Sequence, residues 1–153
     1  LFSDVLQCIR GRGPLIVELK TGRHNRELCR KTLRLLRGYK GDVCVESFDP
    51  RIVMWFRFHA PKLVRGQLSC LPKSFPPEEA SRPEAFLLGN CLMNFMGRPQ
   101  FIAYEIGRKP LTVKLSELMG AMRVCWISHE WVHEKKNDAV IFEFYKPGKK
   151  FKK

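Results

Sequence analysis

The chain has 153 residues, of which 44% are hydrophobic, and this is enough to bury the core of one globular domain. No window of about 18 apolar residues occurs, so no membrane-spanning helix is expected. Lysine and arginine outnumber aspartate and glutamate by 13. A positive field of this size attracts phosphate esters, nucleic acid and acidic lipid head groups alike, and selects none of them.

The first strong strand signal covers residues 15–20, between Pro14 and Gly22. Four apolar side chains in six residues predict a strand buried on both faces. Glu18 within it needs a partner, because a buried, ionised acid is costly unless a cation, a metal or several donors meet it. Lys20 projects to the same side as Glu18, since side chains alternate along a strand. These residues alone leave two interpretations open, a metal-and-phosphate site and a buried ion pair.

Helical and strand-like patterns alternate along the rest of the chain. The expected helices cover residues 3–10, 25–36, 50–58, 86–96, 111–119 and 129–136. The expected strands cover residues 15–20, 42–47, 63–68, 101–104, 123–127 and 139–144. Six strands alternating with helices predict a parallel α/β architecture, either a doubly wound sheet or a barrel. The chain is too short for a complete eightfold barrel, which takes about 250 residues, and it lacks the glycine-rich first turn of a dinucleotide fold.

Cysteine and histidine spacing gives no clear metal site. Six cysteines are isolated among apolar neighbours with no C-x-x-C pair, so we expect reduced core residues in a cytoplasmic protein. His129 to His133 has the letters of the H-E-x-x-H zinc motif. That motif needs a sustained helix and a distant third ligand, so we interpret this segment as a short surface helix. Residues 146–153 are expected to form a basic tail.

Several motifs, in order, resemble one family over almost the whole chain. They are Val17-Glu-Leu-Lys20, Val43-Cys-Val-Glu-Ser-Phe-Asp-Pro50, Pro61-Lys-Leu-Val-Arg-Gly-Gln-Leu68, Arg98-Pro-Gln-Phe-Ile-Ala-Tyr104, Val124-Cys-Trp-Ile-Ser128 and Asp138-Ala-Val-Ile-Phe-Glu143. This family is the glycerophosphodiester phosphodiesterases. The resemblance implies a (β/α)8 barrel with its active site at the carboxyl ends of the strands, and hydrolysis of a small glycerophosphodiester to sn-glycerol 3-phosphate and an alcohol.

The resemblance also implies roles for particular residues. The family binds a divalent cation, Mg²⁺ or Ca²⁺, through two glutamates and an aspartate, and uses two histidines as acid and base. Glu18 matches one of the metal-binding glutamates. Lys20, Ser47 and Trp126 match positions that look into the substrate site.

The family's His-Arg, Glu-Asn-Thr and Asp-x-His segments do not occur in this sequence. They belong to the first two strands of the family's barrel and the loop that follows, so the chain resembles strands three to eight. We therefore expect one incomplete barrel domain over residues 1–153, with about six of eight strands and no catalytic histidine assigned.

Two other functions stay open on the sequence. A catalytically inactive remnant could act as a basic anion-binding or interaction module, and open edges at both ends of the sheet would favour self-association. Charge alone would also allow nucleic-acid binding, but no recognition helix or aromatic-interleaved strand pair is recognisable. We expect at most weak, salt-sensitive binding of this kind, and hence no specific nucleic-acid partner.

Overall fold

A computed structural model describes residues 1–147 of the chain. The strands are β1 (Leu15–Glu18), β2 (Val43–Ser47), β3 (Val64–Ser69), β4 (Phe101–Glu105), β5 (Met122–Ser128) and β6 (Ala139–Phe142). The helices are α1 (Phe2–Ile9), α2 (Asn25–Leu36), α3 (Pro50–His59), α4 (Arg82–Gly89), α5 (Asn94–Gly97) and α6 (Leu111–Leu118), with 3-10 turns η1 (Pro72–Ser74) and η2 (Trp131–Lys135). The predicted basic tail, residues 146–153, lies outside the described residues from 148 onward.

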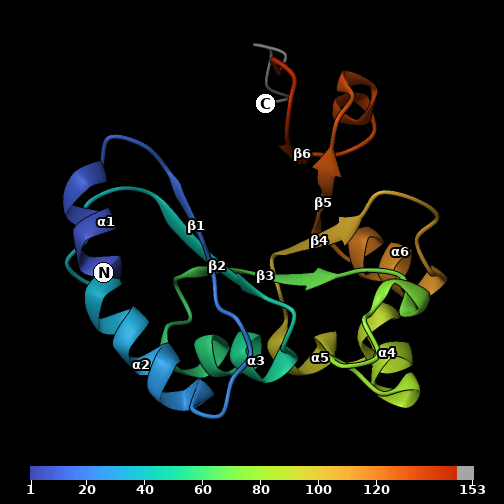
Figure 1. The fold of residues 1–153 in the computed structure, drawn as a ribbon, viewed down its shortest axis with the longest axis horizontal. Coiled ribbons are helices and arrows are strands. Elements are labelled where there is room, and N and C mark those ends of the chain that lie inside the picture. The colour runs from blue at the N-terminus through green and yellow to red at the C-terminus, as the bar shows by residue number, and fades with distance from the viewer. Residues whose placement is uncertain (148–153) are drawn as a thin grey trace.

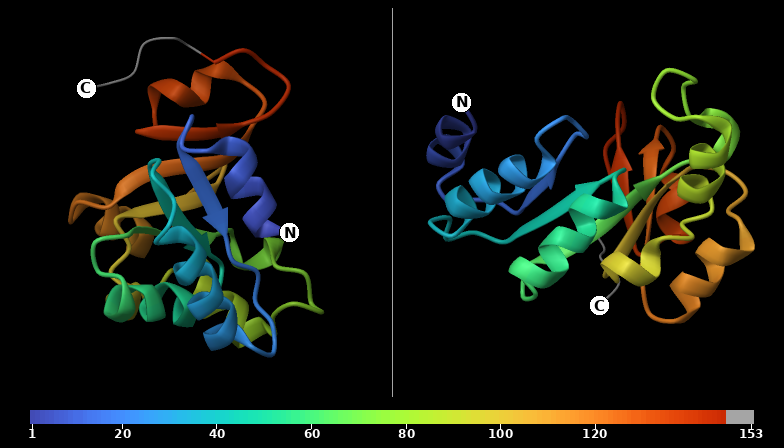
Figure 2. Two further views of the ribbon diagram at one scale, coloured as in Figure 1. Left: turned by 90° about the vertical axis from the view of Figure 1, so that its left-hand side faces the viewer. Right: turned by 90° about the horizontal axis from the view of Figure 1, so that it is seen from below.

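The six strands form one parallel sheet in the order of the chain, from β1 to β6 (Figure 1). The sheet curls, and the main helices lie on its outer, convex side (Figure 2). β1 and β6 are the two edges of this sheet. A curled parallel sheet with helices on one side is an incomplete TIM barrel, which confirms the predicted fold class.

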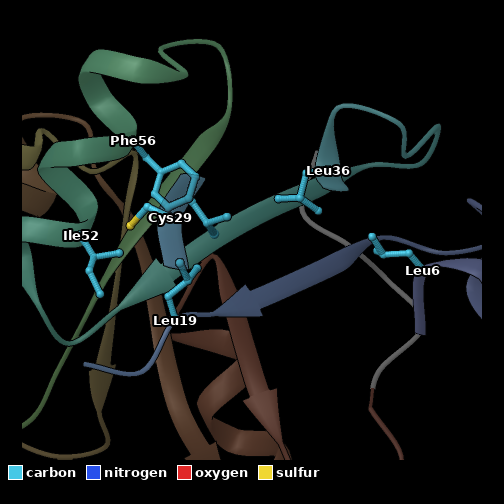
Figure 3. Close-up of a cluster of buried hydrophobic side chains, with 7 residues drawn as sticks. Leu6, Leu19, Cys29, Leu36, Ile52 and Phe56 are labelled. Carbon is cyan, nitrogen blue, oxygen red and sulfur yellow. The ribbon is translucent and has the colours of Figure 1, made fainter. Parts of the chain in front are cut away.

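The largest hydrophobic cluster lies between the first strands and their helices. Figure 3 shows Leu6 of α1, Leu19 after β1, Cys29 and Leu36 of α2, and Ile52 and Phe56 of α3 converging there. The apolar residues recur on one side of each helix, because helical side chains three or four residues apart share a face. A second cluster behind β4 surrounds Tyr104, whose hydroxyl contacts the carbonyl oxygens of Cys70 at 2.9 Å and Gly89 at 2.7 Å.

The concave face of the sheet has its own cluster in the middle strands, formed by Leu68, Phe101, Ala103 and Val124. Gly66 lies opposite Phe101, and its missing side chain makes room for that ring. Toward the sheet's first edge the concave face opens to solvent. The middle of the half-barrel is therefore packed, whereas the β1 side is accessible.

The prediction that β1 is buried on both faces is wrong. The strand ends at Glu18 and pairs only with β2, and Ile16 is 56% exposed. Its apolar residues alternate instead, with Leu15, Val17 and Leu19 facing the helices. A short apolar run does not reveal whether a second neighbouring strand is present, and that neighbour is what burial on both faces requires.

Two expected helices differ from the structure. The apolar segment 86–96 is divided between α4 and α5, and Cys91 at the break has a positive φ of 50°. The segment 129–136 contains only the 3-10 turn η2. The sustained helix that would align His129 and His133 as zinc ligands is therefore missing, and His133 Nδ1 instead lies 2.7 Å from the Ser128 hydroxyl.

All six cysteines are free thiols, as expected, but Cys8 is exposed, and the prediction that it is a core residue is wrong. The other five are buried or half-buried. Burial raises the pKa of Cys29, Cys44 and Cys91 to about 11 and that of Cys70 to about 12. Within residues 1–147, no helix is long and apolar enough to cross a membrane.

Candidate functional site

A pocket of about 580 Å³ lies at the carboxyl ends of β1 and β2. This is the end of a TIM barrel at which active sites are found. Its charged lining residues are Glu18, Lys20, Asp49, Arg51, Glu79 and Glu84. Two of the four residues that the sequence singles out, Glu18 and Lys20, thus lie in one pocket.

Glu18 and Lys20 form an ion pair, with Lys20 Nζ 2.9 Å from Glu18 Oε1. The Glu18 side chain is 32% exposed and the Lys20 side chain 81% exposed. An exposed pair of this kind contributes little stability and is easily exchanged for other partners. The ammonium group can therefore turn to an anion entering the pocket, and the carboxylate can turn to a cation.

Glu46 is a further carboxylate that the sequence prediction missed. It is the register partner of Glu18 across the β1 and β2 pair, so both side chains project from the concave face. Glu46 is 6% exposed, and its Oε2 has no hydrogen-bond partner among the described residues. Burial first, and the negative charge of Glu18 second, raise the pKa of Glu46 to about 7. The signal was present in the sequence, because Glu46 interrupts an apolar strand just as Glu18 does.

The two carboxylates have the chemistry of a hard-cation site. Mg²⁺ prefers oxygen ligands and is commonly held by one or two carboxylates together with water and substrate phosphate oxygens. The unpartnered Oε2 of Glu46 is a buried acceptor with a lone pair to spare. Over residues 1–147, no group of three or more His, Cys, Asp or Glu side chains is placed around a common point. Glu18 and Glu46 by themselves would therefore supply only part of a divalent cation's ligand set.

Both carboxylate oxygens of Asp49, which lines the pocket, already accept hydrogen bonds from neighbouring residues. Its carboxylate caps α3 by accepting from Arg51 N at 2.9 Å, as the Asp49-Pro50 pair predicts, and it also accepts from Asn25 Nδ2 at 2.9 Å. The Arg51 guanidinium donates to both carboxylate oxygens, with Nη2 2.7 Å from Oδ2. Asp49 raises the pKa of Arg51 by this contact. The Arg51 side chain is nevertheless 68% exposed, so it offers a fixed positive charge at the pocket wall.

Ser47 points away from the pocket. It follows Glu46 in β2, so its side chain lies on the opposite, helix-covered face, and it is fully buried. Its hydroxyl donates to the carbonyl oxygen of Leu19 at 2.7 Å and accepts from Asp49 N at 3.1 Å. In the structure, Ser47 fastens the segment after β1 to the start of α3 and so supports the pocket from behind.

Trp126 lies farther round the half-barrel, on β5. Its indole Nε1 donates to the carbonyl oxygens of Ala103 at 3.0 Å and Ser69 at 3.2 Å. The ring meets Phe48 edge-on, with centroids 5.7 Å apart, and Phe48 itself lines the pocket. Trp126 therefore reaches the candidate site through Phe48, whereas Glu18 and Lys20 line it directly.

The four histidines lie elsewhere. His24 and His59 line a separate groove between α2 and α3. His129 and His133 lie after β5, where His129 Nε2 is 3.8 Å from Glu143 Oε2. The pocket residues are thus suited to holding a cation and an anion, and no histidine contributes to its lining.

Comparison with solved structures identifies the fold. The chain is similar to a glycerophosphodiester phosphodiesterase from Parabacteroides distasonis, with a TM-score of 0.64 and 16% identity, over 92% of this chain and 58% of that one. A Silicibacter pomeroyi protein assigned as a glycerophosphoryl diester phosphodiesterase gives a TM-score of 0.67 and 19% identity, over 92% and 51%. A glycerophosphodiester phosphodiesterase from Agrobacterium tumefaciens gives 0.57 and 16%, over 92% and 57%.

The likeness is one of structure, since no family model matches the sequence and no curated protein sequence matches it significantly. The chain spans between 51% and 58% of the length of these neighbours. At these identities the comparison concerns the fold, and it agrees with the six-stranded half-barrel described above. In its fold, therefore, this chain resembles part of a glycerophosphodiester phosphodiesterase.

Proposed function

We propose that the chain contributes the cation- and phosphate-binding side of a phosphodiesterase that hydrolyses glycerophosphodiesters to sn-glycerol 3-phosphate and an alcohol, in phospholipid and glycerol metabolism. The observation that carries the proposal is the pairing of Glu18 and Glu46 on neighbouring strands, beside Lys20, at the carboxyl end of a partial TIM barrel. The similarity to glycerophosphodiester phosphodiesterase structures supports it.

The proposed roles follow from the chemistry of each group. Glu18 and Glu46 would hold a divalent cation, Mg²⁺ or Ca²⁺, which polarises a phosphoryl oxygen when bound. Lys20 and Arg51 would bind the remaining phosphate oxygens, since both present positive charge at the pocket wall. Trp126 would bind substrate together with Phe48, and Ser47 would act by positioning the segments that carry Glu18 and Asp49.

Hydrolysis also needs a base and an acid. The pocket residues described here are assigned to neither role, so the proposal for this chain concerns binding of the cation and the substrate. The free cysteines suit a reducing compartment, and we propose a cytoplasmic location on that ground.

The test is release of glycerol 3-phosphate from glycerophosphocholine by the full-length protein, with Mg²⁺ or Ca²⁺ and with EDTA. We expect release that needs the cation and falls at least a hundredfold in Glu18→Gln, because removing a charged ligand weakens both cation and substrate binding. Glu78→Gln, on an exposed residue that does not line the pocket, is the matched control and should retain activity. Absence of release with either cation would refute the proposal.

The alternative is a non-catalytic anion-binding module. A specific observation favours keeping it, namely that a second groove, lined by α2 and α3, is strongly basic. Apart from Arg51, its charged lining differs from that of the pocket, so the two functions can be tested separately.

A further inference from the structure

A groove of about 1290 Å³ is lined by residues of α2 and α3. These two helices are neighbours on the outer side of the half-barrel (Figure 1). Its charged and aromatic lining consists of Arg23, His24, Arg26, Glu27, Arg30, Arg34, Arg37, Arg51, Trp55, Phe58 and His59. Six of these residues are arginines and only one is an acid. We call this feature the arginine groove.

Five of the arginines form a single stripe. Arg26, Arg30, Arg34 and Arg37 are three or four residues apart, so they share one face of α2 and its C-cap, and Arg23 precedes the helix in the same groove lining. All five are exposed, and at a rise of 1.5 Å per residue the helical part of the stripe, from Arg26 to Arg37, is about 16 Å long. The groove is thus lined along its length by guanidinium groups at regular intervals.

Little of the positive charge of this stripe is compensated within the described structure, since Glu27 attracts Arg30 more weakly than it attracts Lys31. None of its five arginines forms an ion pair or a side-chain hydrogen bond over residues 1–147. Glu27, the one acid in the lining, pairs instead with Lys31 at 2.8 Å. Like charges at this spacing destabilise a helix. An anionic partner bound along the row of arginines would offset this repulsion.

The opposite wall, from α3, is aromatic. Trp55 and His59 are stacked, with ring centroids 4.1 Å apart and planes 4° from parallel. Phe58 is 66% exposed, and the Arg57 guanidinium lies 5.1 Å from its ring centroid. The groove therefore combines a basic side with aromatic rings, of which that of Phe58 is the most exposed.

We propose that the arginine groove binds single-stranded nucleic acid without sequence preference. Proteins of that kind combine a positively charged groove that follows the backbone with aromatic side chains on which bases stack. Arginine suits this task better than lysine, because its planar guanidinium pairs with phosphate bidentately and also stacks on rings. A concave groove fits a strand, whereas a membrane surface would need a protruding or flat face. The proposal does not depend on the phosphodiesterase function.

The test measures binding of a fluorescein-labelled, mixed-sequence 12-nucleotide DNA strand by fluorescence anisotropy, using the full-length protein. The groove variant is Arg26→Gln/Arg30→Gln/Arg34→Gln, since glutamine is as good a helix former as arginine. The control variant Lys62→Gln/Lys73→Gln/Lys114→Gln removes the same charge from exposed residues outside the groove. Circular dichroism establishes that both variants are folded.

We expect the groove variant to bind at least tenfold more weakly at 0.1 M salt, and the control to bind within about threefold of the unmodified protein. The slope of log affinity against log salt should fall by about 2 in the groove variant, since each lost phosphate contact on a single strand removes about 0.7. Equal losses in the two variants would overturn the proposal, because binding would then follow net charge alone.

The aromatic wall provides a second, charge-neutral test. Phe58→Ala should weaken binding about tenfold and leave the salt slope unchanged, since base stacking is independent of counterion release. Unchanged affinity in this variant would contradict the stacking role. Binding of phosphatidylserine vesicles without binding of the DNA strand would also overturn the proposal and identify a membrane surface as the partner.

Discussion

Glu46 lies beside Glu18 across the β1 and β2 pair, almost fully buried, with one carboxylate oxygen that no described group contacts. Burial and the neighbouring charge raise its pKa to about 7, from an ordinary value near 4.5. Between these two pH values the folded protein keeps a proton that the unfolded chain has released. The contribution of Glu46 to stability is therefore fully present below about pH 4.5 and is lost as the pH rises to about 7.

We predict that Glu46→Gln removes this loss, because glutamine cannot ionise. The free energy of unfolding of the variant, relative to the unmodified protein, should rise by about 3 kcal/mol between pH 4.5 and pH 7.5. Urea unfolding at several pH values, in EDTA, measures this difference. A constant difference across the range would contradict the prediction. Glu18→Gln, which removes the neighbouring charge, should reduce the pH dependence only partly, since burial is the larger cause.

Gly66 is the residue at which the concave face tolerates least change. An added Cβ would lie 2.0 Å from Phe101 Cε2, and Phe101 is buried in the cluster of the middle strands. We predict that Gly66→Ala lowers the free energy of unfolding by about 1–3 kcal/mol, because the ring has no free space to enter. Denaturant unfolding checks the loss. The double variant Gly66→Ala/Phe101→Leu should recover part of it, and a double variant less stable than Gly66→Ala would argue against this clash as the cause.

At the scale of secondary-structure elements, α3 depends on its first residues. Asp49 joins the N-terminus of α3 to Asn25 and Arg51, and it is buried. We predict that Asp49→Ala destabilises the protein by about 2 kcal/mol, the upper end for loss of a helix cap, since two further donors also lose their acceptor. Asp49→Asn keeps an acceptor for Arg51 N and should cost less. Thermal unfolding ranks the variants, and equal costs would show that the cap itself contributes nothing.

The sequence predicted most elements because their local signals agree. The alternating helices and strands, the Asp49-Pro50 start of α3 and the parallel order of the sheet all follow from periodicity and capping. The predictions that were wrong depend on tertiary contacts, which a local sequence pattern does not contain. Nothing local distinguishes β1 at an edge from a strand with neighbours on both sides, and the break near Cys91 needs a positive φ that the surrounding apolar residues do not signal.

The candidate site was predicted in part for the same reason. Alternation placed Glu18 and Lys20 together. The same rule, applied to β2, separates Glu46 from Ser47 and sends their side chains to opposite faces. The register that sets Glu46 beside Glu18 arises from pairing between strands 28 residues apart, which no single segment encodes.

At the scale of the whole molecule, β1 and β6 leave both edges of the sheet without a partner strand in the described structure. Ile16 of β1 is 56% exposed on the concave side. We predict that the 153-residue chain, produced alone, self-associates through these edges, because unpaired strands pair with other chains. Sedimentation velocity at increasing concentration measures this association. Ile16→Lys should reduce it, whereas Leu118→Lys, at an 84% exposed position on α6, should not. An unmodified chain that stays monomeric would refute the prediction.

The reactivity of the six cysteine thiols can be used to measure local opening of the folded chain. Cys8 is exposed, whereas the other five thiols are buried or half-buried and have raised pKa values. A thiol reagent should therefore modify one equivalent at once and the remaining five only as fast as the surrounding structure opens. The rate of the slow phase would measure how often the structure opens around α2, β2, β5 and the segments that carry Cys70 and Cys91, with no substitution introduced.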